Sequence, residues 1–422
     1  MKKLIIIGLD GVPFGLIQKL SSDGVMPNTQ KLLTLGIFKK MESTIPEVSS
    51  VAWSSIITGE NPGSHGVFGF TDFRPFSYEI YFPNFNTLKT PTFWEKFNKK
   101  SILINIPSTY PVKEMNGVHI SGFVSIELVK SVYPKSLIPK LKEMDYRLDV
   151  DSSKAHSSME LFLEDIEKTL NALISTYRYL WENYTWEIFM LVFTTTDRLL
   201  HFLWVAQEKN HKYYNEFIRH FQEIDRIIGE IANRIDKDDV IIILSDHGFG
   251  NLEKHFNINF FLKQNGFLKL EGNGENYTDI GYETKAFALD PGRIYINLES
   301  KYPKGSVPLN KYEETVKEII DIFSNLKIEG KKVIRDVYRK HQIYNGKFIE
   351  QAPDIILVGN DGFNLKANIK ANQLYTKDIF TGKHTQDDAF FFINTHKNSI
   401  PEKLSVCDVF YIIEKIINEK IL

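Results

Sequence analysis

The sequence predicts an α/β protein with a doubly wound, mostly parallel sheet, and two observations support this prediction. Several short runs are apolar on both faces and rich in isoleucine, valine and phenylalanine, the pattern of strands buried in the middle of a parallel sheet. Amphipathic helical patterns separate most of these runs, and an alternation of strands and helices is typical of a doubly wound sheet. The predicted strands are KLIIIGL from Lys3, SILINI from Ser101, EIFMLVF from Glu187, DVIIILS from Asp239, RIYINL from Arg293, DIILVG from Asp354 and AFFFIN from Ala389.

The predicted helices lie between these strands, and two stretches interrupt the alternation. The clearest helical patterns begin at Met26, Ser158 and Asn215. Residues 125–185 are largely helical, and residues 265–350 combine a Gly/Asn-rich segment, a strand and a long amphipathic helix. We therefore expect an α/β core made of residues 1–264 and 350–422, with a helical insertion at about 125–185, and a smaller cap subdomain inserted at 265–349.

Composition excludes several classes of protein. The 422 residues carry a formal net charge of -2, which gives no electrostatic reason to expect a nucleic acid polymer or an anionic membrane as partner. The only cysteine, Cys407, excludes an intramolecular disulfide and a Cys-rich metal site. No apolar run is long enough to span a bilayer, and the apolar N-terminal run is too short for a signal peptide and meets Asp10. We expect a cytoplasmic protein without a membrane span, and the sequence carries no signal of its oligomeric state.

Acidic residues follow three of the predicted strands. Asp10 ends the first strand, Asp197 follows the strand from Glu187, and Asp246-His247 follow the strand from Asp239. In an open α/β sheet the carboxyl ends of the strands form the crevice in which ligands bind. We therefore expect these carboxylates to lie close together.

Histidines complete two sets of possible metal ligands. His201 lies four residues after Asp197, so a helix would place both side chains on one face, and His384 lies on a loop just before the last strand. A structural role, as a helix cap for Asp197 and a core histidine for His201, is the alternative. The two predicted metal sites are Asp10 with Asp246 and His247, and Asp197 with His201 and His384. Each set leaves a coordination position open, as catalytic sites do, and a pair of such sites suits phosphoryl displacement.

A hydroxyl nucleophile is expected in STIPEVSSVAWSSIITGENPGSHG, which begins at Ser43. Ser49 and Ser50 precede an apolar helix, where backbone N–H groups bind anions and a nearby metal ion would favour loss of the hydroxyl proton. The alternative is that both serines only cap this helix.

The ordered set of motifs resembles the alkaline phosphatase superfamily, and within it the type I phosphodiesterase/nucleotide pyrophosphatase branch and its uncharacterised prokaryotic relatives. The matching strings run through the chain as GLDG, MPNTQKLLTLG, VSSVAWSSIITGENPGSHGVFGF, TTTDRLLH, SDHGFG, PGRIYINLE, APDIILVG and GKHTQDDAFFF. The resemblance implies an alkaline phosphatase-like fold, the same two ligand sets, and Ser49 as the nucleophile that bridges both metals.

One position departs from the family pattern. Pyrophosphatase relatives usually carry an asparagine after the His-Gly turn to hold a phosphate oxygen, and Phe70 stands at that position here. The oxyanion donor is therefore unassigned. The expected substrate contacts are Phe70, Thr71, Lys254 and His255. The candidates for the oxyanion donor are Thr71, Lys254, His255, Arg198 and the Ser50 backbone N–H, and an ordinary surface or salt-bridge role is the alternative for each of them.

The resulting hypothesis is a metal-dependent phosphohydrolase that forms a phosphoserine-type intermediate on Ser49 and acts on a small phosphodiester or pyrophosphate. Zinc fits three Asp and three His ligands better than magnesium does, and manganese is the alternative. Phosphoryl or head-group transfer, phosphomonoester hydrolysis and a cofactor-independent phosphomutase reaction are the alternative activities. A sulfatase is disfavoured because Ser49 lacks the C/S-x-P-x-R context. A non-catalytic metal-binding protein of the same fold is also considered.

Overall fold

The computed structural model describes residues 2–395 and 400–418 and divides into two compact units. Unit 1 comprises Met1–Glu60, Asn84–Phe249 and His384–Leu422, and unit 2 comprises Asn61–Pro83 and Gly250–Lys383. The predicted cap at 265–349 lies within unit 2.

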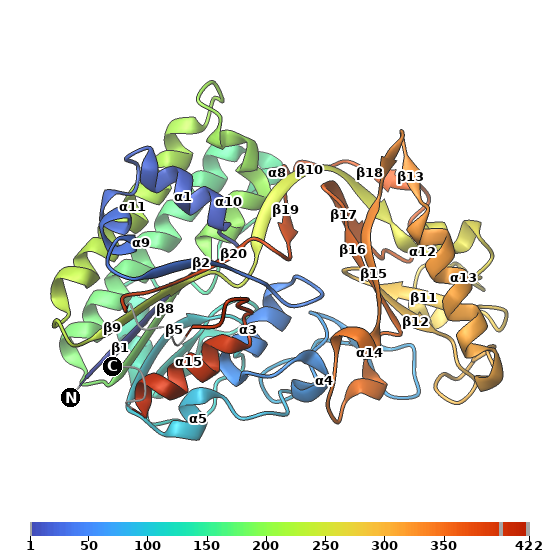
Figure 1. Cartoon of the computed structure of the whole chain (residues 1–422), viewed down its shortest axis with the longest axis horizontal. Helices are drawn as coiled ribbons and strands as arrows, with labels where there is room; N and C mark the ends of the chain where they lie inside the picture. The colour runs from blue at the N-terminus through green and yellow to red at the C-terminus, as the bar shows by residue number, and fades with distance from the viewer. Residues whose placement is uncertain (1, 396–399, 419–422) are drawn as a thin grey trace. The chain divides into compact units, whose positions relative to one another are not determined.

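An eight-stranded sheet forms the centre of unit 1 (Figure 1). Its five inner strands are parallel and its edge strands are antiparallel, so the predicted fold class is confirmed. The strand order is β2 (Ile37–Met41), β20 (Ala389–Ile393), β9 (Val240–Leu244), β1 (Leu4–Leu9), β8 (Ile188–Phe193), β5 (Ser101–Ile106), β6 (Gly117–Ser121) and β7 (Val132–Tyr133).

Helices cover both faces of this sheet, which explains why its strands are apolar throughout. Successive residues of a strand point to opposite faces, and β8 shows this directly. The Phe189 ring packs against Tyr177 and Trp181 on one face, whereas Met190 belongs to the core on the other face. The first face carries α1 (Phe14–Ser22), α9 (Met159–Asn183), α10 (Thr195–Leu203) and α11 (Tyr214–Arg234), and the second carries α3 (Ser49–Thr58), α5 (Phe93–Phe97) and α15 (Asp408–Ile417).

Shorter helices complete unit 1. The predicted helical insertion contains α6 (Leu128–Ser131), α7 (Ile138–Glu143), α8 (Lys154–Ser157) and α9, and α2 (Pro27–Leu33) packs against α11. In the part of the chain that the structure describes, no helix is both long and apolar enough to cross a bilayer.

Unit 2 has its own core around an antiparallel sheet. Its strand order is β11 (Ala286–Leu289), β12 (Arg293–Ile296), β16 (Ile355–Gly359) and β15 (Ile334–Arg339), and its longer helices are α12 (Ile258–Gln264) and α13 (Tyr312–Ser324). The prediction that DIILVG belongs to the large sheet of the core is therefore wrong, whereas RIYINL lies in the segment predicted as a cap. Both strands are buried on both faces, so their apolar runs look the same as those of a parallel sheet.

Two of the four passages of the chain between the units lie in strands. They are β10 (Gly248–Asn257) and β19 (Gly382–Thr385), which pair with each other in a second four-stranded sheet that also contains β17 (Gly362–Lys366) and β18 (Tyr375–Thr376). Each connection therefore begins or ends next to a predicted ligand, His247 in one case and His384 in the other.

Candidate active site

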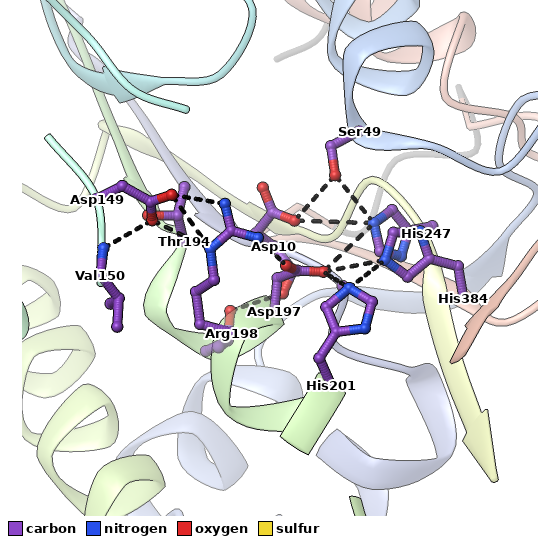
Figure 2. A network of polar contacts seen from close by, with 12 residues as sticks. Asp10, Ser49, Asp149, Val150, Thr194, Asp197, Arg198, His201, His247 and His384 are labelled. Carbon is purple, nitrogen blue, oxygen red and sulfur yellow. Dashed lines mark hydrogen bonds and ion pairs between the residues drawn. The ribbon is translucent and has the colours of Figure 1, made fainter. Parts of the chain in front are cut away.

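Three buried carboxylates converge at the carboxyl ends of adjacent strands in unit 1. Figure 2 shows two of them, Asp10 and Asp197. Strand β1 lies between β8 and β9, and each of these strands leads into one carboxylate. Asp10 directly follows β1, Asp246 follows β9, and Asp197 lies in the first turn of α10 after β8. All three side chains are buried, with residue exposures of 3%, 0% and 5% respectively. Parallel neighbouring strands thus produce the convergence that the sequence predicts.

The histidines lie around these carboxylates. His384 Nε2 lies 3.1 Å from Asp197 Oδ1 and 3.0 Å from His201 Nε2. His201 Nε2 is 3.5 Å from the same carboxylate oxygen. His247 Nε2 lies 3.5 Å from Asp246 Oδ2 and 3.8 Å from Asp10 Oδ1. The structure therefore brings the members of each predicted ligand set together.

His247 also links the two sets. Its Nε2 lies 4.0 Å from Asp197 Oδ1, and its ring stacks on His384 with centroids 3.7 Å apart. Ligand atoms of Asp10, Asp246 and His247 lie within 4.8 Å of one another, as do those of Asp197, His247 and His384. The two sets form one continuous cluster of donors.

The electrostatics of the cluster fit bound cations. Asp246 Oδ1 accepts a hydrogen bond from the Gly11 N–H, but the buried Oδ2 makes none. Burial, together with the charge of Asp197, raises the pKa of Asp246 to about 7. Burial and the charges of Asp246 and Asp197 raise the pKa of Asp10 well above its ordinary value. Without a cation these carboxylates repel one another in a site shielded from water, so their residue types and placement fit a metal centre.

Neighbouring charges outweigh burial at Asp197, whereas burial dominates at His247. Burial alone would raise the pKa of Asp197, but the positive charges of His201, His384 and Arg198 outweigh it and lower that pKa. Burial lowers the pKa of His247 well below its ordinary value. A neutral imidazole is the form that binds a metal ion.

Ser49 lies at the edge of this cluster as the first residue of α3. Its Oγ is 3.2 Å from His247 Nε2 and 3.4 Å from Asp10 Oδ1. The N-cap residue of α3 is Val48, and no side chain caps this helix. The alternative that Ser49 and Ser50 only cap the helix is therefore wrong.

The same holds for the structural alternative at Asp197. The N-cap residue of α10 is Thr194, and no side chain caps that helix either. Asp197 instead receives a hydrogen bond from Arg198, whose Nη1 lies 3.1 Å from Asp197 Oδ2. Asp197 and His201 share one face of α10, as their spacing predicts.

Three supporting residues were not predicted. Trp53 Nε1 donates to Asp10 Oδ2 at 3.0 Å, one helical turn after Ser49. Asp149 accepts from Arg198 Nη2 at 2.6 Å (Figure 2). The centroid of the Phe123 ring lies 4.1 Å from the Arg198 guanidinium. The i,i+4 spacing from Ser49 to Trp53 is a signal that sequence reasoning could have used. No comparable signal marks Asp149 or Phe123, which come from other segments of the chain.

Arg198 forms salt bridges, which is the alternative to a role as oxyanion donor. Its guanidinium bonds to both Asp149 and Asp197, and their charges raise its pKa against the opposing effect of burial. Arg198 therefore holds Asp197 rather than presenting a free cation.

The four expected substrate contacts belong to unit 2. Lys254 forms an ion pair with Glu329, and its ammonium lies 4.4 Å from the centroid of the Tyr375 ring. His255 is buried, and its Nε2 lies 2.9 Å from Asp378 Oδ2. Thr71 Oγ1 lies 3.5 Å from a guanidinium nitrogen of Arg293, and Phe70 is partly exposed. Their role in substrate binding stays a prediction.

Comparison with known proteins gives one family. The family model for type I phosphodiesterase / nucleotide pyrophosphatase matches residues 4–387. No curated protein matches the sequence.

Solved structures share the fold over nearly the whole chain. Phosphonoacetate hydrolase from Sinorhizobium meliloti 1021, in complex with phosphonoformate, has a TM-score of 0.64 at 16% identity, covering 97% of this chain and 94% of that chain. Murine ectonucleotide pyrophosphatase / phosphodiesterase 5, as an inactive variant with AMP, has a TM-score of 0.58 at 11% identity, covering 99% and 95%. The human counterpart has a TM-score of 0.57 at 13% identity, covering 99% and 95%.

Proposed function

We propose that this chain, which belongs to the type I phosphodiesterase / nucleotide pyrophosphatase family of phosphoester hydrolases, hydrolyses a small phosphodiester or pyrophosphate. Ser49 is the proposed nucleophile. The observation that carries this proposal is the position of the Ser49 hydroxyl. Its Oγ lies within 3.4 Å of Asp10 and His247, at the N-terminus of a helix and beside a cluster of buried carboxylates.

Two divalent ions are proposed to complete the site. Asp10, Asp246 and His247 would hold one ion, and the second would be held by Asp197, His201 and His384. Zinc is the expected metal because half of these ligands are imidazoles, and manganese is the alternative. When bound, such ions favour loss of a hydroxyl proton and stabilise the charge that develops on a transferred phosphoryl group.

The proposed reaction has two steps, and each residue of the site has a separate role in them. Ser49 Oγ attacks phosphorus in line, its proton passes to solvent, and the bond between phosphorus and the leaving-group oxygen breaks. The backbone N–H groups at the start of α3 face the negative charge on phosphorus. Water then cleaves the phosphoserine ester, which releases the phosphate product and restores the Ser49 hydroxyl. Arg198 and Trp53 keep Asp197 and Asp10 in position throughout.

Ser49→Ala tests the nucleophile. We expect turnover of bis-p-nitrophenyl phosphate to fall by at least about 10² and a chelator to abolish the wild-type activity. The wild type should cleave this diester faster than p-nitrophenyl phosphate. Ser54→Ala is the matched control, because Ser54 lies on the same helix and donates to the Ser50 carbonyl oxygen at 2.6 Å rather than to a residue of the catalytic cluster.

The outcomes separate the alternatives. Equal rates for wild type and Ser49→Ala would remove Ser49 from the mechanism. Faster cleavage of the monoester would identify a phosphomonoesterase. Bound metal without turnover of either ester would support a non-catalytic metal-binding protein.

A further inference from the structure

Unit 1 contains a cavity that none of the catalytic cluster residues lines. Its volume is about 470 Å³, and its walls come from α9 and α11 with part of α10. This volume falls in the range of small-molecule sites. The catalytic proposal uses none of the residues that line it.

The walls of the cavity are strongly acidic. Five glutamates line it, and Arg219 is the only arginine or lysine among the lining residues. The glutamates are Glu160, Glu164 and Glu167 on α9 and Glu216 and Glu223 on α11. Glu164 and Glu223 have basic neighbours on their own helices, Lys168 and Arg226.

The charges of Glu160 and Glu216 are only partly compensated, by Lys212 and Arg219 respectively. Glu160 accepts hydrogen bonds from the hydroxyls of Tyr213 and Ser158, which lower its pKa to about 2 and keep it ionised. Glu216 Oε2 is shielded from solvent and makes no hydrogen bond, and Arg219 lies 3.8 Å from the other oxygen. A buried carboxylate oxygen without a donor is costly unless a ligand supplies one.

The floor of the cavity is apolar and includes one buried histidine. Leu163, Ile166 and Leu199 contribute aliphatic surface. His220 is 7% exposed, and burial lowers its pKa to about 4, so it adds no positive charge. Its Nε2 lies 3.3 Å from Thr195 Oγ1, while its Nδ1 makes no hydrogen bond to any residue that the structure describes. That nitrogen can accept a hydrogen bond from a ligand when Nε2 carries the ring hydrogen.

We propose that this cavity binds a linear aliphatic polyamine. Such a ligand offers ammonium groups to the glutamates and methylene segments to the apolar floor. Glu160, Glu164 and Glu167 follow one another at i, i+4 and i+7, a rise along α9 of about 6 Å and then about 4.5 Å. This spacing matches ammonium groups separated by propylene or butylene segments.

A metal ion fits this cavity less well. Metal ligands must converge on one point, whereas these carboxylates are spread along two helices. Among the described residues, the clusters with metal-ligand spacing contain none of these glutamates.

The cavity borders α10, the helix that carries Asp197 and His201. Leu199 lines the cavity and Thr195 contacts His220, while Asp197 and His201 on the same helix contact His384. A bound polyamine would therefore contact α10 on the side that carries Leu199. Any effect of binding on turnover rests on the proposed function, but the binding site itself does not.

Calorimetric titration of the full chain with spermidine at low salt tests the site. We expect one binding site in the wild type, and at least about tenfold weaker binding in Glu167→Gln/Glu216→Gln, because charge-assisted hydrogen bonds are lost. The control variant Glu143→Gln/Glu182→Gln makes the same charge change at exposed positions of α7 and α9 outside the cavity and should bind as the wild type does. Leu163→Arg, which places a cation in the cavity, should also abolish binding.

Three results would overturn the proposal. They are no binding to the wild type, equal weakening in both double variants, and equal competition by magnesium ions at the same ionic strength. Circular dichroism and thermal unfolding check that each variant folds. Because calorimetry requires no turnover, an inactive enzyme that binds spermidine would contradict the proposed function and leave this site intact.

Discussion

Buried aspartates occur in both units, and two of them show how a satisfied carboxylate differs from an unsatisfied one. Asp354 in unit 2 accepts the Ile296 N–H at 2.8 Å and the Tyr312 hydroxyl at 2.9 Å, with Lys340 Nζ at 3.5 Å. Asp246 in unit 1 has one oxygen without a hydrogen bond and two acidic neighbours that share its site. Burial alone therefore does not mark a functional carboxylate. The difference lies in whether the surrounding protein already neutralises the charge.

Asp246→Asn should give the largest effect, and the effect should be on activity. Removing a ligand of the proposed metal centre is expected to lower turnover of a phosphodiester by at least about 10². In metal-free protein the free energy of unfolding should not fall, because the variant removes repulsion among buried carboxylates. Enzyme kinetics and urea unfolding in the presence of a chelator measure the two quantities. A large loss of stability without loss of activity would reverse the contrast with Asp354.

Asp354→Asn should give the opposite result. The variant weakens two hydrogen bonds and leaves the buried Lys340 with Glu350 as its remaining carboxylate partner, so we expect a loss of about 2 kcal/mol in the free energy of unfolding. Turnover per folded molecule should change little. Urea unfolding and active-site-normalised kinetics test this, and loss of activity at unchanged stability would contradict it.

His119 is a third kind of buried polar residue, to be compared with Asp246 and Asp354. One of its ring nitrogens lacks a hydrogen bond, but no cluster of charges surrounds it. Its Nε2 lies 3.0 Å from Thr109 Oγ1, its Nδ1 has no hydrogen bond, and Phe85 and Trp94 pack against its ring. Burial lowers its pKa to about 3. The unfolded chain therefore takes up a proton below about pH 6.5 that the folded chain refuses, and stability is lost as the pH falls from about 6.5 to about 3.

His119→Gln measures that loss. Between pH 6.5 and 5 the wild type should lose about 2 kcal/mol more than the variant, which cannot take up this proton. Unfolding free energies at both pH values provide the test. Identical losses in the two proteins would mean that His119 is protonated in the folded state.

Trp53→Phe should give the smallest effect. The variant keeps an aromatic ring and removes the Nε1 hydrogen bond to Asp10. Groups that orient metal ligands typically contribute 10–100-fold, and we expect the low end, a fall of about tenfold in kcat that excess zinc partly restores. A fall in stability with unchanged kcat would show that Trp53 only packs the core.

The comparison also shows which features were accessible from sequence. Strand ends and the i,i+4 spacing predicted that Asp10, Asp197, His201 and Asp246 would meet, because parallel neighbouring strands force their carboxyl ends together. The choice of Ser49 over Ser50 needed the family resemblance, since both serines begin the same helix.

Other features could not be read from local patterns. The DIILVG strand was assigned to the core sheet because burial on both faces erases the alternation that distinguishes sheet types. Asp149 reaches Arg198 only through the tertiary fold, across 49 residues of sequence. Strand pattern predicts burial, and only the three-dimensional pairing of charges separates Asp246 from Asp354.

The pairing of β10 with β19 also constrains protein engineering. Everything between Gly250 and Lys383 is threaded between His247 and His384, whose rings stack at 3.7 Å. A chimera that exchanges this cassette for that of another enzyme must preserve the strand register at its two splice points. A one-residue slip at either junction would turn an imidazole away from its partner, however well the transplanted cassette folds.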